Sequence, residues 1–90
     1  MAAYTVTVRP KARRALRHLD GTARKAVAQV IDALADDPRP PGVRALTGHR
    51  PYLRVRSGDY RVIYAVDDAI RQVRVVVIGH RRDVYRKLDL

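Results

Sequence analysis

Three strand-like segments follow one another in YLRVRSGDYRVIYAVDDAIRQVRVVVI, residues 52–78, the stretch that decides the fold. Apolar side chains alternate with arginines in residues 53–56, which is typical of a half-buried strand. Turn-forming residues at positions 57–58 and 67–68 separate the segments, and connections this short join antiparallel neighbours. Residues 75–78 form a continuous apolar run, as in a central strand covered on both faces. The stretch therefore predicts three consecutive antiparallel strands.

One further strand and two helices are expected before this stretch. Residues 4–8 alternate and are rich in β-branched side chains, which indicates a strand. Apolar residues at helical spacing predict a short helix from Pro10 to about Asp20, and a second helix from about Thr22 to Asp36. The expected fold class is α+β, in the order β-α-α-β-β-β. An antiparallel helical hairpin packs on a four-stranded, mainly antiparallel sheet, and a short helix can follow at the C-terminus.

Length and composition limit the classes of function. Ninety residues make one small domain, residues 1–90, and no cysteine is present for a disulfide or thiolate site. His18, His49 and His80 are too scattered for a metal-ligand spacing, so no metal or cofactor is expected. The chain shows neither a signal-peptide pattern nor an apolar run of about 20 residues. We therefore expect a cytoplasmic protein that does not bind membranes.

The charge of the chain points to a polyanionic partner. The formal net charge is +10, which gives salt-dependent affinity for nucleic acid. Lysine occurs only at positions 11, 25 and 87, and all other basic residues except histidine are arginines. Guanidinium groups bind phosphate bidentately and stack on bases. GC-rich coding explains the arginines of the helices equally well, but it explains those of the strands less well. RNA is the expected substrate.

Strand alternation assigns several arginines to one sheet face. If Leu53 and Val55 meet the helices, Arg54 and Arg56 lie on the opposite face, which is expected to be free. Arg61, near the start of the next strand, then reaches the same cleft. Tyr60 and Tyr64 are expected to face the helices as core residues, and His18 and His49 to face solvent. The last strand ends in GHRRDVY, residues 79–85, which brings an imidazole, two arginines and a phenol to this region.

These motifs resemble those of the RelE toxins, within the RelE/ParE superfamily of bacterial toxin–antitoxin systems. The resemblance covers essentially the whole chain and is strongest over residues 52–64 and 79–85, while residues 46–48 look like the loop before the family's second strand. It implies a β-α-α-β-β-β fold and a ribonuclease that cuts mRNA in the ribosomal A site. In that reaction the ribose 2′-hydroxyl attacks the adjacent phosphate, leaving a 2′,3′-cyclic phosphate and a 5′-hydroxyl.

The resemblance also implies site residues. Arg54 matches a basic strand residue that faces the phosphate, and Arg61 matches the arginine that stabilises the transition state. Arg81 matches a C-terminal arginine, placed here near the leaving oxygen, and Tyr85 matches the tyrosine that positions or stacks on the RNA. Further RNA-binding residues are expected to be Arg44, Arg56 and Arg82.

The chain departs from the family at one position. The best-studied members carry a lysine at the start of the second strand, near Tyr52 here, and no lysine lies in this region. Arginine stabilises charge but is a poor general base because it stays protonated. His80 is therefore the predicted base, while Tyr85 orients the ribose or lends a proton. The alternative is a His80 that hydrogen-bonds to the backbone at a strand end.

The expected partners follow from the charge and the resemblance. They are an acidic, partly disordered cognate antitoxin and the ribosome with mRNA in its A site, with operator DNA bound only through the antitoxin complex. Two alternatives stay open. One is a ParE-like inhibitor of DNA gyrase without nuclease activity, and the other is a non-catalytic nucleic-acid-binding or corepressor homologue. The HRRD pattern at residues 80–83 occurs in both toxin branches and does not separate them.

Overall fold

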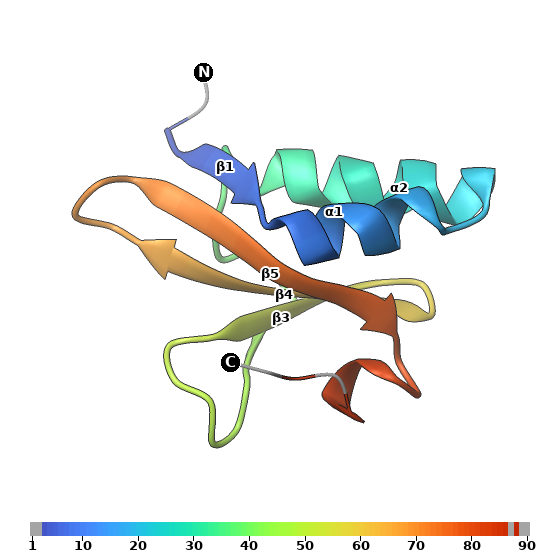
Figure 1. Ribbon diagram of the computed structural model, residues 1–90. Coiled ribbons are helices and arrows are strands. Elements are labelled where there is room, and N and C mark those ends of the chain that lie inside the picture. Colours follow the sequence, from blue (N-terminus) through green and yellow to red (C-terminus); the bar gives the residue numbers. More distant parts are fainter. Residues whose placement is uncertain (1–2, 87, 89–90) are drawn as a thin grey trace.

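The computed structural model of the chain describes residues 3–86 and 88. Its elements are β1 (Thr5–Val8), α1 (Pro10–Arg17), α2 (Gly21–Ala33), β2 (Arg44–Ala45), β3 (Leu53–Ser57), β4 (Tyr60–Asp67), β5 (Gln72–His80) and a short 3-10 helix, η1 (Val84–Arg86). Both long helices lie on one face of the sheet and η1 lies on the other (Figure 1). The expected α+β class is confirmed, including the short C-terminal helix.

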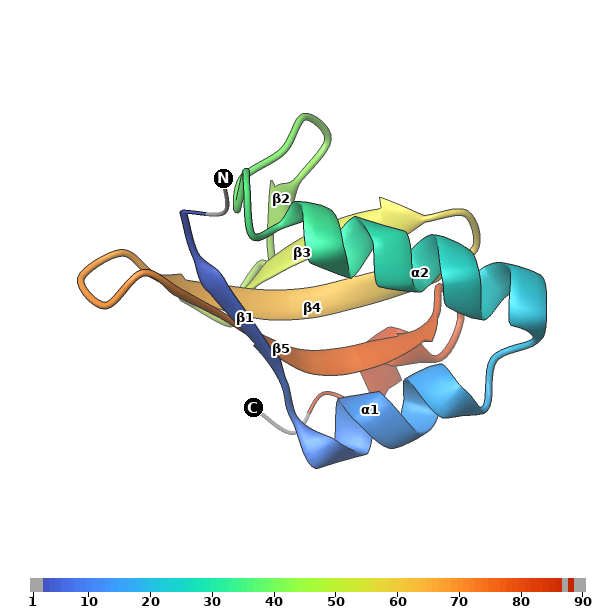
Figure 2. The ribbon, with the colours of Figure 1, turned by 90° about the horizontal axis from the view of Figure 1, so that it is seen from above.

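Over the described residues the sheet has five strands in the order β1-β5-β4-β3-β2, so the predicted count of four is one too low. The additional strand is β2, whose two residues pair with β3. It follows a proline-rich connector, residues 38–42, that leads from α2. All neighbours are antiparallel except β1, which runs parallel to β5 at one edge. Figure 2 shows α1 along β5 and α2 over β4 and β3. The helical hairpin therefore covers the sheet from β5 to β3.

The first hydrophobic core lies between the helices and the sheet. Asp20 caps α2, because its Oδ1 accepts a hydrogen bond from the backbone N–H of Ala23 at 2.9 Å. The buried side chains of this core are Ala12, Val27, Ile31, Leu34, Val55, Val62, Tyr64, Val73, Val75 and Ile78. Tyr64 is fully buried and donates to the carbonyl oxygen of Pro38 at 2.7 Å, while Tyr60 packs at the edge of the core. The prediction that both tyrosines face the helices is confirmed.

A second group of buried side chains covers the centre of the sheet face opposite the helices, here called the far face. It consists of Leu46, Ile63, Val76 and Val84, with Tyr52, Val77 and Leu88 packed against it. Leu46 comes from the loop after β2 and Val84 from η1, so both segments close over this face. The expectation that the far face is free is therefore wrong for its centre. Polar side chains there must lie around the apolar cluster.

A bulge in β5 explains why residues 75–78 are apolar throughout. Its register with β4 shifts by one residue in this region, so two successive residues of β5 lie on the same face. Val75 and Ile78 pack under the helices, and the two valines between them pack on the far face. The prediction of a central strand covered on both faces is confirmed. His80 lies two residues after Ile78 with no further register shift between them, so both side chains point to the helix side of the sheet.

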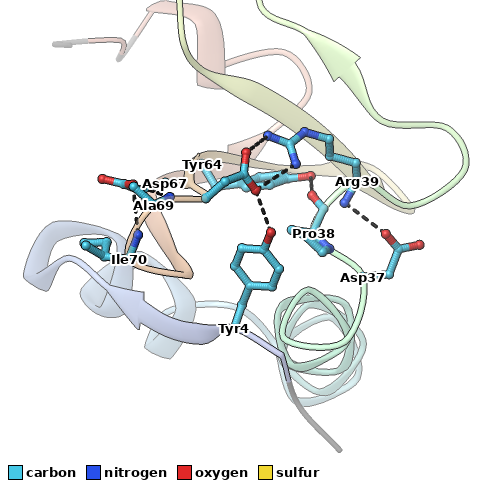
Figure 3. A network of polar contacts seen from close by, with 9 residues as sticks. Tyr4, Asp37, Pro38, Arg39, Tyr64, Asp67, Ala69 and Ile70 are labelled. Carbon is cyan, nitrogen blue, oxygen red and sulfur yellow. Dashed lines mark hydrogen bonds and ion pairs between the residues drawn. The ribbon is translucent and has the colours of Figure 1, made fainter.

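A polar network fastens the connector after α2 to the turn between β4 and β5 (Figure 3). Asp68 accepts two hydrogen bonds from Arg39, at 3.0 and 3.3 Å, and one from the hydroxyl of Tyr4. The hydrogen bonds from Arg39 and then Tyr4 hold the pKa of Asp68 below its ordinary value. The network therefore fixes the start of the connector that leads to β2.

We expect Tyr64→Phe to change the alkaline limit of stability. Burial raises the pKa of Tyr64 to about 12 from an ordinary value of 10.0. Its contribution to the free energy of unfolding is therefore complete below pH 10.0 and is lost as the pH rises toward 12. At neutral pH the variant should lose about 1 kcal/mol, because the Pro38 carbonyl loses its donor.

Denaturant unfolding of both proteins at neutral and alkaline pH checks this expectation. The wild type should lose stability more steeply above pH 10.0 than the variant. Parallel losses in the two proteins would show that Tyr64 does not set the alkaline limit.

Candidate functional site

Four arginines face one another across strands at the rim of the far face. The register pairs Arg44 of β2 with Arg54 of β3, and Arg56 of β3 with Arg61 of β4. Leu53 and Val55 pack with the helix-side core, so the arginines of β3 point to the far face, as predicted. Side chains directly opposite on one face lie about 5 Å apart at Cβ, and like charges there repel. The sheet thus concentrates positive charge at the cost of local stability.

Within residues 3–86 and 88, no ion pair compensates the charge of these four arginines. Among residues 3–86 and 88, the ion pairs join Arg39 to Asp68 and Arg81 to Asp59. No carboxylate of the described chain therefore pairs with Arg44, Arg54, Arg56 or Arg61. Groups held close together with one sign of charge attract an anion with several charges, such as a phosphodiester chain.

A hollow of about 470 Å³ opens beside Arg44 and Arg54. It is lined by Arg44, Ala45, Leu46, Thr47, His49, Arg54, Tyr85 and Leu88. Nη1 of Arg54 donates a hydrogen bond to the hydroxyl oxygen of Tyr85 at 2.6 Å. Tyr85 reaches this position because its neighbour Val84 is fully buried and anchors η1 on the sheet. The predicted association of Arg54 with Tyr85 in one site therefore has a definite geometry.

A second hollow continues the cationic surface, which we define as Arg44, Arg54 and Arg56. This hollow has a volume of about 260 Å³ and shares Arg44 and Arg54 with the first one. Its remaining lining residues are Pro41, Gly42, Val55 and Arg56. The cationic surface therefore borders two adjoining hollows.

Arg61 and Arg81 lie in a different group, at the turn between β3 and β4. Arg61 is only 8% exposed, and its Nη1 donates to the carbonyl oxygens of Gly58 and Tyr60, each at 3.0 Å. Arg81 forms an ion pair with Asp59 at 3.5 Å, and its backbone N–H donates to the carbonyl of that residue at 2.7 Å. Neither arginine lines the hollow of Tyr85. The predicted site residues thus form two groups, with Arg54 and Tyr85 in the hollow and Arg61 and Arg81 at the turn between β3 and β4.

His80 does not lie with the arginines of the far face. Its ring meets that of Tyr60 edge-on, with centroids 5.6 Å apart, on the helix side of the sheet. Its Nδ1 accepts a hydrogen bond from the backbone N–H of Arg82 at 3.2 Å, while Arg82 itself is exposed. The predicted placement of this imidazole beside Arg54 and Arg56 is therefore wrong, because the bulge in β5 sets the face of His80. The alternative, a histidine bonded to the backbone at a strand end, describes its contacts.

His49 also lines the hollow, and the sequence does not predict it as a site residue. The sequence predicts that it faces solvent, and it is exposed, yet it lines the hollow together with Arg54 and Tyr85. A single histidine in an irregular loop gives no periodicity from which its neighbours could be inferred. Within the described residues, no group of three or more potential ligands could hold a metal ion, and no helix is long and apolar enough to cross a membrane.

Comparisons with known proteins agree with this architecture. Residues 6–85 match the family described as the ParE toxin of the type II toxin-antitoxin system, parDE. The chain is 32% identical to Toxin RelE of Mycobacterium tuberculosis over 84 residues, which cover 92% of this chain and 87% of that protein. The structure resembles the archaeal RelE-RelB complex of Pyrococcus horikoshii, with a TM-score of 0.78, 27% identity and coverage of 88% and 96%. It also resembles the toxin-antitoxin complex RelBE2 of M. tuberculosis, with a TM-score of 0.74 and 29% identity. That match covers 88% of this chain and 99% of the other.

We expect Arg44→Thr to weaken RNA binding without lowering the stability of the fold. The change removes the repulsion between Arg44 and Arg54, so the free energy of unfolding should stay constant or rise by about 0.2–1 kcal/mol. Affinity for a short single-stranded RNA should fall, and the slope of its salt dependence should decrease by about 0.7. Denaturant unfolding and fluorescence anisotropy at several salt concentrations measure both effects.

Arg24→Gln, on the exposed surface of α2, removes the same charge away from the far face and is the matched control. Equal losses of RNA affinity in the two variants would mean that net charge alone, rather than the cationic surface, binds RNA.

Gly79→Ala should loosen the packing of η1, which carries Tyr85. A Cβ at Gly79 would lie 3.3 Å from the Cβ and 3.4 Å from the Cα of Val84, so η1 would have to give by a few tenths of an ångström. Such overpacking costs about 1–3 kcal/mol. Amide exchange should accelerate in residues 84–86 more than in the helix-side core.

In the control Gly21→Ala, the new Cβ would meet only Arg24, at 4.0 Å, and exchange in η1 should not change. Unaltered exchange at η1 in Gly79→Ala would contradict the packing argument.

Proposed function

This chain belongs to the RelE/ParE family of toxins of type II toxin–antitoxin systems, and on that premise we propose that it is a ribosome-dependent mRNA endoribonuclease. The single observation that carries the proposal is the hollow in which the hydroxyl of Tyr85 contacts Arg54 beside Arg44, two arginines that pair with no carboxylate of the described residues. In the proposed reaction a ribose 2′-hydroxyl attacks the adjacent phosphate. The products are a 2′,3′-cyclic phosphate and a 5′-hydroxyl, and translation stops because the message is cut.

The arginines of the cationic surface bind the scissile phosphate and its neighbours. Arg54 lies in both hollows and contacts Tyr85, so its guanidinium is placed to stabilise the charge that develops on the phosphate oxygens. Arg44 and Arg56 flank it and hold the adjoining phosphates through bidentate hydrogen bonds. Their mutual repulsion in the free protein is relieved when the anionic chain binds.

The arginines at the β3–β4 turn take a supporting part. Arg61 stands opposite Arg56 and adds positive charge to that end of the far face, while its bonds to backbone carbonyls keep it in place. The side chain of Arg81 is 50% exposed and its ion pair with Asp59 is worth little in water, so it can exchange this carboxylate for a phosphate of the bound RNA outside the hollow of Tyr85. The predicted position of Arg81 near the leaving oxygen is not kept, because Tyr85 lies in the other group. Arg82 adds exposed charge beside Arg81.

The proposed partners are a cognate antitoxin and the ribosome. RelE of P. horikoshii is found in a complex with RelB. The similar structure from M. tuberculosis is the toxin-antitoxin complex RelBE2. An acidic antitoxin segment would neutralise the cationic surface and exclude RNA from it. The ribosome presents mRNA in its A site, and operator DNA is reached only through the antitoxin complex. A toxin with these proposed partners would act in the cytoplasm.

A second candidate function is inhibition of DNA gyrase without nuclease activity, as in the ParE branch. It is favoured by one observation, namely that the matching family model is that of the ParE toxin. The two functions differ in what they damage, because the first cuts messages and the second breaks DNA.

Brief expression in cells distinguishes these functions. We expect the wild type to produce mRNA breaks in phase with codons, mapped as new 5′ ends. Arg54→Ala should reduce them by about 10²- to 10³-fold, because a donor to the developing charge is removed. Tyr85→Phe keeps the ring and removes only the hydroxyl that accepts from Arg54, so it should also reduce cutting.

Arg24→Gln, which lies on α2, is the control for net charge and should cut like the wild type. Intact messages accompanied by gyrase-dependent DNA breaks would reject the nuclease in favour of the second candidate. Intact messages and intact DNA would reject both, leaving a non-catalytic homologue.

A further inference from the structure

The proposed reaction needs a group that removes the proton of the 2′-hydroxyl. The arginines of the hollow stay protonated and cannot serve. The hydroxyl oxygen of Tyr85 already accepts a hydrogen bond from Arg54, and a neutral phenol is a weak base. The other described lining residues besides His49 are alanine, leucine and threonine. Imidazole is the side chain that takes up a proton near neutral pH.

The loop that carries His49 is held at both ends. The backbone N–H of Leu46 donates to the carbonyl of Tyr52 at 2.9 Å, which closes the loop. Inside it, the N–H of His49 donates to Leu46 at 3.0 Å, and its carbonyl accepts from Tyr52 at 2.9 Å. Leu46 is buried in the far-face cluster and Tyr52 packs against it. The backbone of His49 is therefore fixed relative to the sheet that carries Arg54.

We propose that His49 is the general base of this toxin and that Tyr85 is its general acid. This inference rests on the proposed nuclease function. The 2′-oxygen passes its proton to a ring nitrogen of His49 and forms a bond to phosphorus. The bond from phosphorus to the 5′-oxygen then breaks, and this oxygen takes the phenolic proton of Tyr85. Afterwards the imidazolium returns its proton to water and the phenolate takes one, so no water is consumed overall.

The contact between Arg54 and Tyr85 suits the acid role. The phenolic oxygen accepts from Nη1 of Arg54, so its own O–H is free to point to another acceptor in the hollow. The guanidinium also stabilises the negative charge left on the phenolic oxygen after proton transfer. His49 and Tyr85 thus provide a base and an acid that line the same hollow.

Single-turnover cleavage of A-site mRNA by purified toxin at saturating concentration tests the assignment. His49→Ala and His49→Gln should each lower the rate by about 10²- to 10⁴-fold. The rise in rate between about pH 5 and pH 8 should disappear in both, and added imidazole should partly restore cutting by His49→Ala. RNA affinity, measured separately, should change little. His18→Ala, at the exposed end of α1, is the matched control.

The outcomes separate this inference from the function on which it depends. If the wild type makes no cyclic phosphate on programmed ribosomes, both fail. If it does, and the His49 variants keep its rate and pH profile, only the inference fails. The inference also fails alone if the pH-dependent rise is lost in His80→Gln, or in Lys87→Met, but retained in His49→Gln. Lys87 is included because it lies outside the described residues.

Discussion

Apolar packing on both faces of β4 and β5 is the constraint on which the rest of the structure depends. The helix-side core holds the sheet against α1 and α2, while the far-face cluster holds the loop after β2 and η1. Because Val84 is buried in that cluster, the next residue, Tyr85, comes within hydrogen-bonding distance of Arg54. The far-face cluster therefore positions the candidate site, whose polar side chains lie around the edge of that cluster.

Much of this architecture could be predicted from residue patterns. Alternation in residues 53–56 placed Arg54 and Arg56 on the far face correctly, and short turns fixed the antiparallel order of β3, β4 and β5. The two-residue strand β2 could not be predicted, because its pairing depends on the distant β3 rather than on its own sequence. The covering of the far face also escaped prediction, since residues 46 and 84 join one cluster only after the chain folds.

The two histidines show why the site was harder to predict than the fold. His80 lies in a motif that resembles the family's, but a one-residue shift in pairing turns it to the helix side, and sequence alone does not show the bulge. His49 lies in an irregular loop and reaches the hollow through the closure of that loop. Strand periodicity therefore located the arginines, whereas the placement of either imidazole required the three-dimensional pairing and loop geometry.

The facing arginine pairs have an opposite response to ionic strength in folding and in binding. Dissolved salt screens the repulsion between Arg44 and Arg54 and between Arg56 and Arg61, so it should make the unbound chain harder to unfold. The same ions compete for phosphate contacts and weaken association with a polyanion. A buffer that preserves the isolated protein best is accordingly one in which the proposed association with a polyanion is weakest, and storage and assay of this molecule call for different solutions.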